Sequence, residues 1–160
     1  MYTAYYRSPV GVVRVSSTDH YICEVHFLDE IPAGASVQLN PMLQGCLEQL
    51  VEYFQGLRRT FDLPVSQPGT PFQQRVWSEL IGIPFGRTIS YMEFSKRIGD
   101  PKAIRAVAAT NGKNQVAIIL PCHRVIGSNQ DLVGYGGGIW RKRWLLEHEN
   151  KIANGVQTLF

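Results

Sequence analysis

The sequence predicts an α/β protein of the α+β kind, in which a small N-terminal antiparallel sheet with one helix precedes a mostly helical C-terminal domain. Residues 2–28 contain runs of alternating apolar and polar side chains separated by turn residues, the pattern of short antiparallel strands. Beyond residue 40, apolar residues recur at helical spacing after helix-capping residues. Two short helical segments over 91–112, separated by a glycine turn, predict a helix-turn-helix.

The first helix is expected to begin at Asn40-Pro41, because asparagine caps a helix and proline is favoured at its first position. Cys46 falls on its inward, apolar face, and Gly56 is expected to end it. A loop rich in proline, serine and glycine over 63–69 then marks a domain boundary. We therefore predict an N-terminal lobe over residues 1–66, a C-terminal domain over 67–153 and a tail over 154–160.

Helix-start signals also order the second half of the chain. Thr70 begins one helix with a capping box, and Ser90 begins a short helix that ends at Gly99. Asp100 is expected to cap the next helix, which carries alanines on its presumed outer face. Small side chains let a helix approach a groove closely, so this pair of helices is a candidate DNA-binding element. Two packed helices without a ligand are the alternative at this point.

The composition is that of an ordinary soluble protein, with 160 residues of which 44% are hydrophobic and 18% are charged. This length suits one domain, or a small lobe beside a larger one. The apolar runs are shorter than a membrane span, and the N-terminus lacks a signal-peptide core. We therefore expect a cytoplasmic protein without a membrane partner.

Cysteine spacing and charge distribution narrow the classes of function further. Cys23, Cys46 and Cys122 lack CxxC spacing, which argues against a disulfide framework and a zinc site. Cys23 and His26 are expected to be packing residues, so no metal is predicted. Residues 1–80 carry five Lys/Arg and eight Asp/Glu, whereas residues 81–160 carry eleven and five. The basic second half suggests a polyanionic partner such as nucleic acid.

An apolar run over 116–120 leads into Pro121 and Cys122, and this run is expected to be extended and buried. A thiol is a strong nucleophile only as thiolate, and a neighbouring imidazole or cation lowers its pKa. Cys122 is followed by His123 and Arg124, which favours a nucleophilic cysteine. The alternative is a buried structural cysteine, because free cysteine is among the most buried residue types.

Four of the five residues over 134–138 are glycine, and the fifth is Tyr135. Such a loop lets backbone amides approach a ligand while the aromatic ring packs on it; a flexible surface loop is the alternative. The final helix is expected to carry Trp140, Trp144, Leu145 and His148 on one face, with Arg141, Lys142 and Arg143 on or near the other.

The segment 121–125, preceded by the helix-turn-helix and followed by 134–138 and 145–149, resembles the O6-alkylguanine-DNA alkyltransferases, also called methylated-DNA–protein-cysteine methyltransferases. The resemblance is close over residues 70–150 and covers the N-terminal lobe in outline. Cysteine stands at the acceptor position, where alkyltransferase-like proteins have tryptophan. The resemblance implies DNA repair by direct reversal, without a cofactor. The alkyl group of O6-alkylguanine, and as a further candidate O4-alkylthymine, would move irreversibly to the protein's own cysteine in one turnover.

The resemblance also implies a set of catalytic residues. Cys122 matches the acceptor, His123 the base and Glu149 the carboxylate that orients the imidazole, while Asn114 matches a hinge asparagine that braces the segment. Adjacent side chains on an extended segment point in opposite directions, so a bridging water is expected between the cysteine and the histidine. Relatives often have proline after the hinge asparagine, where this chain has Gln115.

The partner that the resemblance implies is double-stranded DNA, bound through the minor groove by a monomer that flips the damaged base. Arg105, with Ala106 beside it, would enter the vacated base stack. Tyr91 would crowd the phosphate of the target nucleotide and donate a hydrogen bond to the base.

The same resemblance implies a pocket for the flipped guanine. The carbonyls of Cys122 and Val125 would accept from its amino group, Tyr135 would stack on it and the Gly136 amide would reach O6. Two other functions stay open: a protein that binds alkylguanine lesions without accepting the group, and a hydrolase that uses Cys122 and His123.

Overall fold

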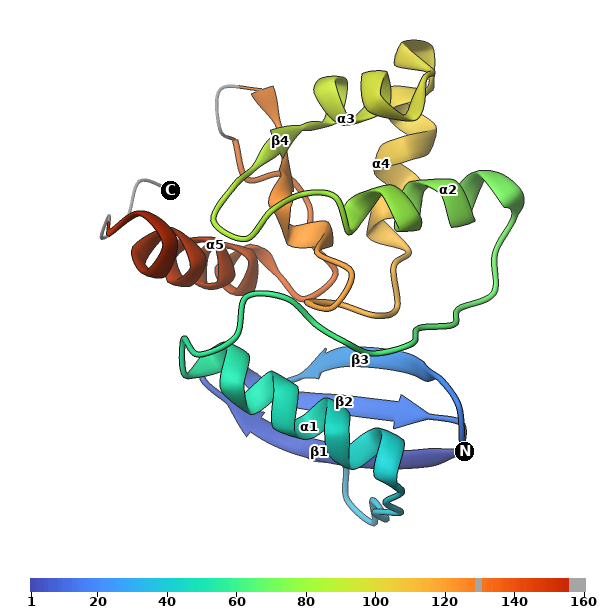
Figure 1. Ribbon diagram of the computed structural model, residues 1–160, viewed down its shortest axis with the longest axis vertical. Helices are drawn as coiled ribbons and strands as arrows, with labels where there is room; N and C mark the ends of the chain where they lie inside the picture. The colour runs from blue at the N-terminus through green and yellow to red at the C-terminus, as the bar shows by residue number, and fades with distance from the viewer. Residues whose placement is uncertain (129–130, 156–160) are drawn as a thin grey trace. The chain divides into compact units, whose positions relative to one another are not determined.

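The computed structural model describes residues 1–128 and 131–155, which form two compact units (Figure 1). The first unit consists of residues 1–67 and 115–119, and the second of residues 68–114 together with the chain from 120 onward. Of the expected tail over 154–160, Asn154 ends the last helix, and residues 156–160 lie outside the described part. No helix within the described ranges is long and apolar enough to cross a membrane.

The first unit is a three-stranded antiparallel sheet with a helix against one face (Figure 1). Its strands are β1 (Tyr2–Ser8), β2 (Gly11–Ser17) and β3 (Ile22–Leu28), in that spatial order. Helix α1 (Pro41–Phe54) packs against all three. Gly11 closes the first hairpin with a φ of 93°, a left-handed conformation that glycine adopts without strain. The predicted N-terminal sheet with one helix is confirmed.

The start of α1 follows from its capping residues. The side-chain oxygen of Asn40 accepts a hydrogen bond from the Leu43 amide at 2.8 Å, and Pro41 occupies the first turn. Cys46 lies on the buried face with no exposed surface. Burial raises the pKa of its thiol to about 12, so this cysteine stays protonated in the core, as its helical position predicts.

The second unit is mostly helical and begins with α2 (Pro71–Leu80). Thr70 and Gln73 form the predicted capping box, each side chain bonding the other's backbone amide. The Trp77 indole on α2 donates to the Thr110 carbonyl at 3.1 Å, which ties this helix to α4 (Ile104–Gly112).

Helices α3 (Tyr91–Ile98) and α4 form the predicted helix-turn-helix, joined by Gly99 and a 3-10 turn, η1 (Pro101–Ala103). Gly99 ends α3 with a φ of 94°. The expected side-chain cap from Asp100 is wrong, because this side chain makes no cap hydrogen bond. Pro101 restricts the backbone of Asp100, and the backbone carbonyl of Asp100 instead accepts from the Ala103 amide at 3.0 Å.

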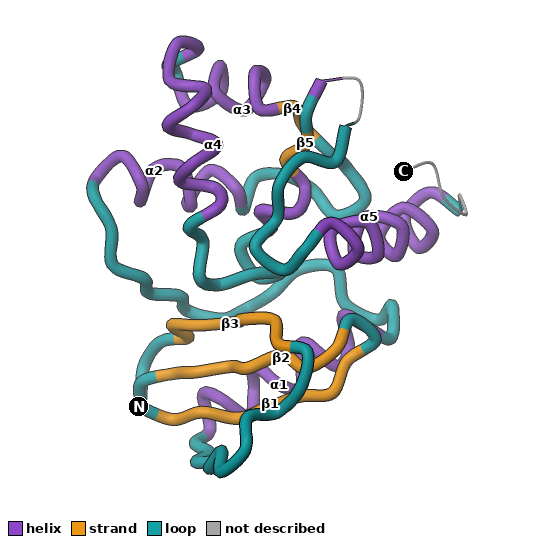
Figure 2. Tube along the Cα trace, turned by 180° about the vertical axis from the view of Figure 1, so that it is seen from behind, coloured by secondary structure: helices purple, strands orange, loops and turns teal. Residues whose placement is uncertain are grey.

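A two-stranded parallel pairing brings two distant segments together. Strand β4 (Ile89–Ser90) pairs with β5 (Val125–Ile126), in the register Ile89 with Val125 (Figure 2). Ser90 is also the N-cap of α3, and β5 directly follows a 3-10 turn, η2 (Cys122–Arg124). The cysteine segment therefore lies beside the start of α3.

The apolar run over 116–120 is buried, as predicted, but it is not extended. Only Val116 forms a bridge, with Val25 in β3, and residues 117–119 form a turn. The Ile119 amide bonds the Ala117 carbonyl at 2.7 Å around Ile118, which has a φ of 69°. This γ-turn strains a β-branched residue. A turn can bury apolar side chains as well as a sheet can, so the apolar pattern alone does not show that this run is extended.

The final helix, α5 (Ile139–Asn154), buries basic as well as apolar side chains. Trp140 is 50% exposed, while Lys142 has no exposed surface. The sequence places the aromatic and the basic residues on different faces without indicating which face is buried, and the structure buries Lys142 while Trp140 stays half exposed. Backbone carbonyls of the same unit accept hydrogen bonds from the buried Arg141 and Lys142. The buried side chains are Arg141, Lys142, Leu145, Leu146 and Glu149.

Candidate functional site

Cys122 is a free cysteine at the start of η2, with 5% of its surface exposed. Its amide bonds the Leu120 carbonyl at 2.7 Å around Pro121, whose φ of −79° and ψ of 63° make an inverse γ-turn. Asn114 and Tyr135 both lower the pKa of its thiol, so two predicted site residues lie close to the sulfur.

Burial has the largest effect on the pKa of Cys122. Burial raises the pKa of the thiol, whereas the nearby polar groups of Asn114 and Tyr135 and the charge of Lys142 oppose that rise. The net direction is upward, so the resting group is a neutral thiol. The cation that lowers the thiol pKa is Lys142 and not the expected neighbour Arg124, and burial outweighs its effect. A base must remove the proton before the sulfur can attack.

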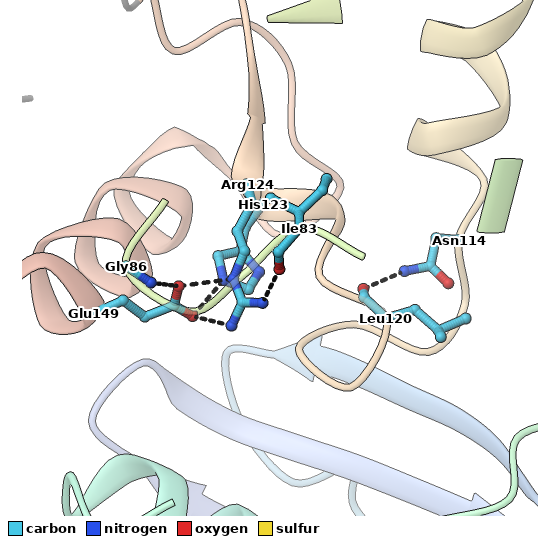
Figure 3. Close-up of polar contacts among 7 residues, drawn as sticks. All are labelled: Ile83, Gly86, Asn114, Leu120, His123, Arg124 and Glu149. Atoms are coloured by element: carbon cyan, nitrogen blue, oxygen red, sulfur yellow. Dashed lines mark hydrogen bonds and ion pairs between the residues drawn. The ribbon is translucent and has the colours of Figure 1, made fainter. Parts of the chain in front are cut away.

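His123 and Glu149 form a buried pair, 2.7 Å apart between Nε2 and Oε2 (Figure 3). The imidazole is entirely buried, and the carboxylate is 1% exposed. The other ring nitrogen, Nδ1, is buried and has no hydrogen-bond partner among the described residues. A buried polar nitrogen of this kind normally bonds a group or a water, so it is available for the predicted water link to the thiol.

Arg124 completes this cluster, but as a partner of Glu149 and not as the expected cation beside Cys122. Its guanidinium donates to both carboxylate oxygens of Glu149, at 2.8 and 3.1 Å, and to the Ile83 carbonyl at 2.7 Å (Figure 3). The Gly86 amide reaches the same carboxylate at 3.5 Å. Glu149 is thus held in place by a bidentate contact as well as by the histidine.

Burial and nearby charges keep His123 neutral and Glu149 ionised. Burial lowers the pKa of His123, against the raising effect of Glu149, so its imidazole is neutral at pH 7. His123 and Arg124 hold the pKa of Glu149 well below its usual range despite burial, so this carboxyl is ionised. A neutral imidazole beside a carboxylate can accept a proton and be stabilised as imidazolium.

The extended geometry expected at Cys122 and His123 is wrong, because both residues lie in the 3-10 turn η2. The Arg124 amide bonds the Pro121 carbonyl at 3.0 Å and closes this turn. The two side chains nevertheless have different neighbours: Asn114 and Tyr135 affect the thiol, whereas the imidazole contacts Glu149.

Asn114 joins the end of the helix-turn-helix to the cysteine segment. Its amide nitrogen donates to the Leu120 carbonyl at 2.9 Å (Figure 3). In the first unit, the backbone N–H of Gln115 donates to the Gln67 side chain at 3.0 Å. Proline has no N–H and could not make that bond, so glutamine after the predicted hinge residue has a local structural reason.

The predicted DNA-contacting side chains lie on the open surface of α3 and α4. Arg105, Ala106 and Ala109 of α4 are exposed, which confirms that alanines occupy its outer face. Tyr91 at the start of α3 is half-buried. Asn111, on the inner face of α4, donates from Nδ2 to the Tyr91 hydroxyl at 3.3 Å and to the Cys122 carbonyl at 3.2 Å.

Lys142 fixes the segments that carry the remaining predicted pocket residues. Its ammonium donates to the carbonyls of Val125, Val133 and Gly134, at 2.8, 3.1 and 3.4 Å. Burial lowers its pKa to about 8. A side chain added at Gly136 would meet nothing within 4 Å, so the backbone there faces open space.

Sequence analysis missed Asn111 and Lys142 as members of this cluster, and it missed the contact of Arg124 with Glu149. Lys142 and Glu149 are seven residues apart, on the same helix face as the apolar Leu145 and Leu146. That spacing is the one available sequence signal. Among the described residues, no group of three or more His, Cys, Asp and Glu side chains could hold a metal ion.

The buried pair predicts an acid-sensitive fold. His123 has a lowered pKa in the folded state, so below about pH 6.5 the unfolded chain binds the extra proton and stability falls. Glu149 also has a lowered pKa, so its contribution is present above about pH 4.5 and is lost as pH falls toward the folded value. Each group should change the free energy of unfolding by up to about 1.4 kcal/mol per pH unit.

Urea unfolding between pH 5 and 7.5 measures the histidine part of this effect. The unfolding free energy of the His123→Asn protein should change less with pH than that of the unsubstituted protein. An equal pH dependence of the two unfolding free energies would mean that this histidine is not held neutral by the fold.

Comparison with known proteins identifies the family. A model described as the 6-O-methylguanine DNA methyltransferase ribonuclease-like domain matches residues 1–67, and one described as the DNA binding domain of the same protein matches residues 71–151. The chain is 43% identical over 156 residues to a methylated-DNA–protein-cysteine methyltransferase from Mycobacterium bovis, covering 96% of this chain and 94% of the relative. A protein of the same name from Methanosarcina acetivorans is 40% identical over 154 residues, covering 93% and 98%.

Solved structures give the same result. The crystal structure of Mycobacterium tuberculosis OGT in complex with DNA matches with a TM-score of 0.86 at 41% identity, covering 95% of this chain and 94% of that chain. The crystal structure of Mycobacterium tuberculosis O6-methylguanine methyltransferase matches with a TM-score of 0.84, also at 41% identity, covering 97% and 96%. The family resemblance and the α+β fold class are thereby confirmed, and the chain belongs to the 6-O-methylguanine DNA methyltransferase family.

Proposed function

We propose that this protein repairs DNA by direct reversal, as a methylated-DNA–protein-cysteine S-methyltransferase that acts once. Each molecule takes the alkyl group from O6 of a flipped guanine onto the sulfur of Cys122 and needs no cofactor. The observation that carries the proposal is the free thiol of Cys122 beside the buried His123–Glu149 pair. Its unit also contains an exposed basic helix-turn-helix, and a relative of 41% identity has been crystallised with DNA.

The reaction is one displacement at the alkyl carbon. The sulfur of Cys122 forms a bond to that carbon as the bond from carbon to O6 breaks, and the electron pair leaves with the guanine. The thiol proton passes to His123, through a water that bonds Nδ1. Burial of the thiol makes this transfer necessary, because the resting sulfur is protonated.

Glu149 and Arg124 support the proton transfer without touching the substrate. The Glu149 carboxylate stabilises the imidazolium that forms on His123, and Arg124 keeps that carboxylate ionised and oriented. Asn114 holds the Leu120 carbonyl and the thiol, so the sulfur keeps its direction during attack.

Access to O6 requires the base to leave the stack. Arg105 fills the vacated position from the minor groove, with Ala106 against the groove wall and Tyr91 at the phosphate of the target nucleotide. The carbonyls of Cys122 and Val125 then accept from the guanine amino group. Tyr135 packs on the base, and the Gly136 amide donates to O6.

The substitution Arg105→Ala should separate base flipping from chemistry. Transfer from O6-methylguanine in a duplex should slow about 100-fold, because unstacking a base costs a few kcal/mol that the arginine offsets. Transfer from free O6-benzylguanine needs no flipping and should be nearly unchanged. Single-turnover rates on both substrates measure the difference, with Arg97→Ala, an exposed arginine on α3, as control. Equal losses on both substrates would refute this role for Arg105.

Stoichiometry tests the proposed function as a whole. Titration with a duplex that contains O6-methylguanine should remove one methyl group per protein molecule and then stop. Binding without removal would indicate a lesion-binding protein, and repeated turnover on an ester or peptide would indicate a cysteine hydrolase. We further propose that the protein works as a monomer in the cytoplasm. Sedimentation of the free and the DNA-bound protein would test the oligomeric state.

A further inference from the structure

Asn111 connects three segments of the second unit at one point. It lies in the last turn of α4, with 5% of its surface exposed. Its side-chain Nδ2 donates to the hydroxyl of Tyr91 at the start of α3 and to the carbonyl of Cys122 in η2. Its position therefore links the part that handles the base to the part that reacts with it.

The orientation of this carboxamide is fixed by chemistry. A backbone carbonyl is only an acceptor, so the atom of Asn111 that faces the Cys122 carbonyl must be the NH2 group. That group has two hydrogens, and the second one points to Tyr91. The reversed orientation would place two oxygens in contact.

This contact limits where the hydroxyl hydrogen of Tyr91 can point. Its oxygen accepts a hydrogen bond from Asn111, so its own hydrogen must point elsewhere. A hydroxyl without such a partner rotates to suit its surroundings and can act as donor or acceptor. With an N–H group already bonded to its oxygen, the Tyr91 hydroxyl keeps its hydrogen available for donation to another group.

The cost of this arrangement supports a functional reason for it. The Oδ1 atom of Asn111 is buried and has no hydrogen-bond partner among the described residues. Burying an unsatisfied oxygen is unfavourable, and native proteins seldom retain one without a reason. An apolar side chain of the same size would fill this position in the helix without that cost.

We propose that Asn111 is a positioning residue for alkyl transfer, which orients the Tyr91 hydroxyl as a hydrogen-bond donor to the departing guanine and holds the Cys122 carbonyl toward the base. This inference rests on the proposed function. As the bond from carbon to O6 breaks, negative charge develops on the guanine, and a donor fixed in advance stabilises that charge. The Cys122 carbonyl has a second lone pair, so it can accept from Asn111 and from the base together.

A double-mutant cycle with Tyr91 tests the inference. The variants are Asn111→Leu, Tyr91→Phe and the two combined, measured by single-turnover transfer from O6-methylguanine DNA and by DNA dissociation constant. Asn111→Leu should slow transfer about tenfold while the dissociation constant changes little, because the lost interaction acts on the leaving group. In the Tyr91→Phe background, where no hydroxyl remains to be oriented, the same change should slow transfer about twofold or less.

Controls separate positioning from stability. Thr110→Val removes a hydroxyl from the neighbouring buried residue of α4 and should leave the transfer rate unchanged. Melting temperatures of all variants identify any loss caused by unfolding. Asn111→Asp replaces the NH2 donor by an acceptor and should slow transfer more than Asn111→Leu, most strongly above the pKa of the new carboxyl.

Two outcomes would overturn the inference. One is that the rate losses of Asn111→Leu and Tyr91→Phe multiply, which would mean that the two residues act independently. The other is that Asn111→Leu transfers as fast as the unsubstituted protein. Transfer by the unsubstituted protein in the same assay keeps these outcomes distinct from failure of the proposed function, in which no variant would transfer.

Discussion

The Cys122→Ser protein is expected to lose transfer by at least about 10⁴-fold and to bind an O6-alkylguanine duplex as tightly as the unsubstituted protein. Serine has nearly the shape of cysteine, so the packing around η2 and the hydrogen bonds of its backbone should persist. A hydroxyl is a far weaker nucleophile, and His123 cannot ionise it to a useful extent. Single-turnover removal of the methyl group and duplex binding, measured on the same preparation, check both parts.

Cys23→Ser is the matched control, because Cys23 is a free cysteine in the sheet of the first unit. It should transfer at the normal rate. Residual transfer by Cys122→Ser at more than a few per cent of the normal rate would mean that another residue accepts the group. Loss of DNA binding together with transfer would mean that the sulfur is needed for the structure of the binding surface.

Glu149→Gln should reduce stability more than any exposed substitution. It leaves Arg124 as a buried cation without its carboxylate, which costs about 3–5 kcal/mol of unfolding free energy. It also removes the group that stabilises imidazolium on His123, so the protein that remains folded should transfer the alkyl group slowly. Chemical denaturation measures the first effect, and the single-turnover rate at a temperature where the variant is folded measures the second.

The same substitution at an exposed ion pair provides the control. Glu52 contacts Arg58 at 3.0 Å with 43% of its side chain exposed, and Glu52→Gln should cost about 0–1 kcal/mol. The double variant Glu149→Gln with Arg124→Met removes both buried charges and should recover much of the stability but not the transfer rate. Recovery of the rate as well would show that Glu149 acts through stability alone.

Local signals explain why much of the fold was predictable. Asn40, Thr70 and Ser90 each accept a hydrogen bond from a backbone amide in the first turn of their helices, as their residue types indicate. Gly99 takes the left-handed conformation expected at a helix end. These features depend on a few neighbouring residues, so the sequence alone contains the information.

Features that depend on distant partners were predicted wrongly or missed. Lys142 looks like a solvated residue of a helix, but the carbonyls of Val125, Val133 and Gly134 accept its hydrogen bonds inside the unit. Ile118 belongs to a run that reads as a strand, but its backbone is left-handed. Such environments arise only when the chain brings separate segments together.

The site shows the same division. Cys122 and His123 are adjacent in the sequence, and the family resemblance supplied Glu149 as partner of the imidazole. Arg124 and Asn111 are polar residues whose partners lie on other segments, and no spacing rule connects them. The contacts that orient the carboxylate and the Tyr91 hydroxyl could therefore be identified only from the structure.

The site of alkylation can be read directly from the mass of the reacted protein. After reaction with a duplex that contains O6-methylguanine, proteolysis and mass spectrometry should find one added CH2 on the peptide that carries Cys122, and none on the peptides with Cys23 or Cys46. An unmodified Cys122 peptide, in a preparation that has removed the methyl group from the DNA, would contradict this assignment.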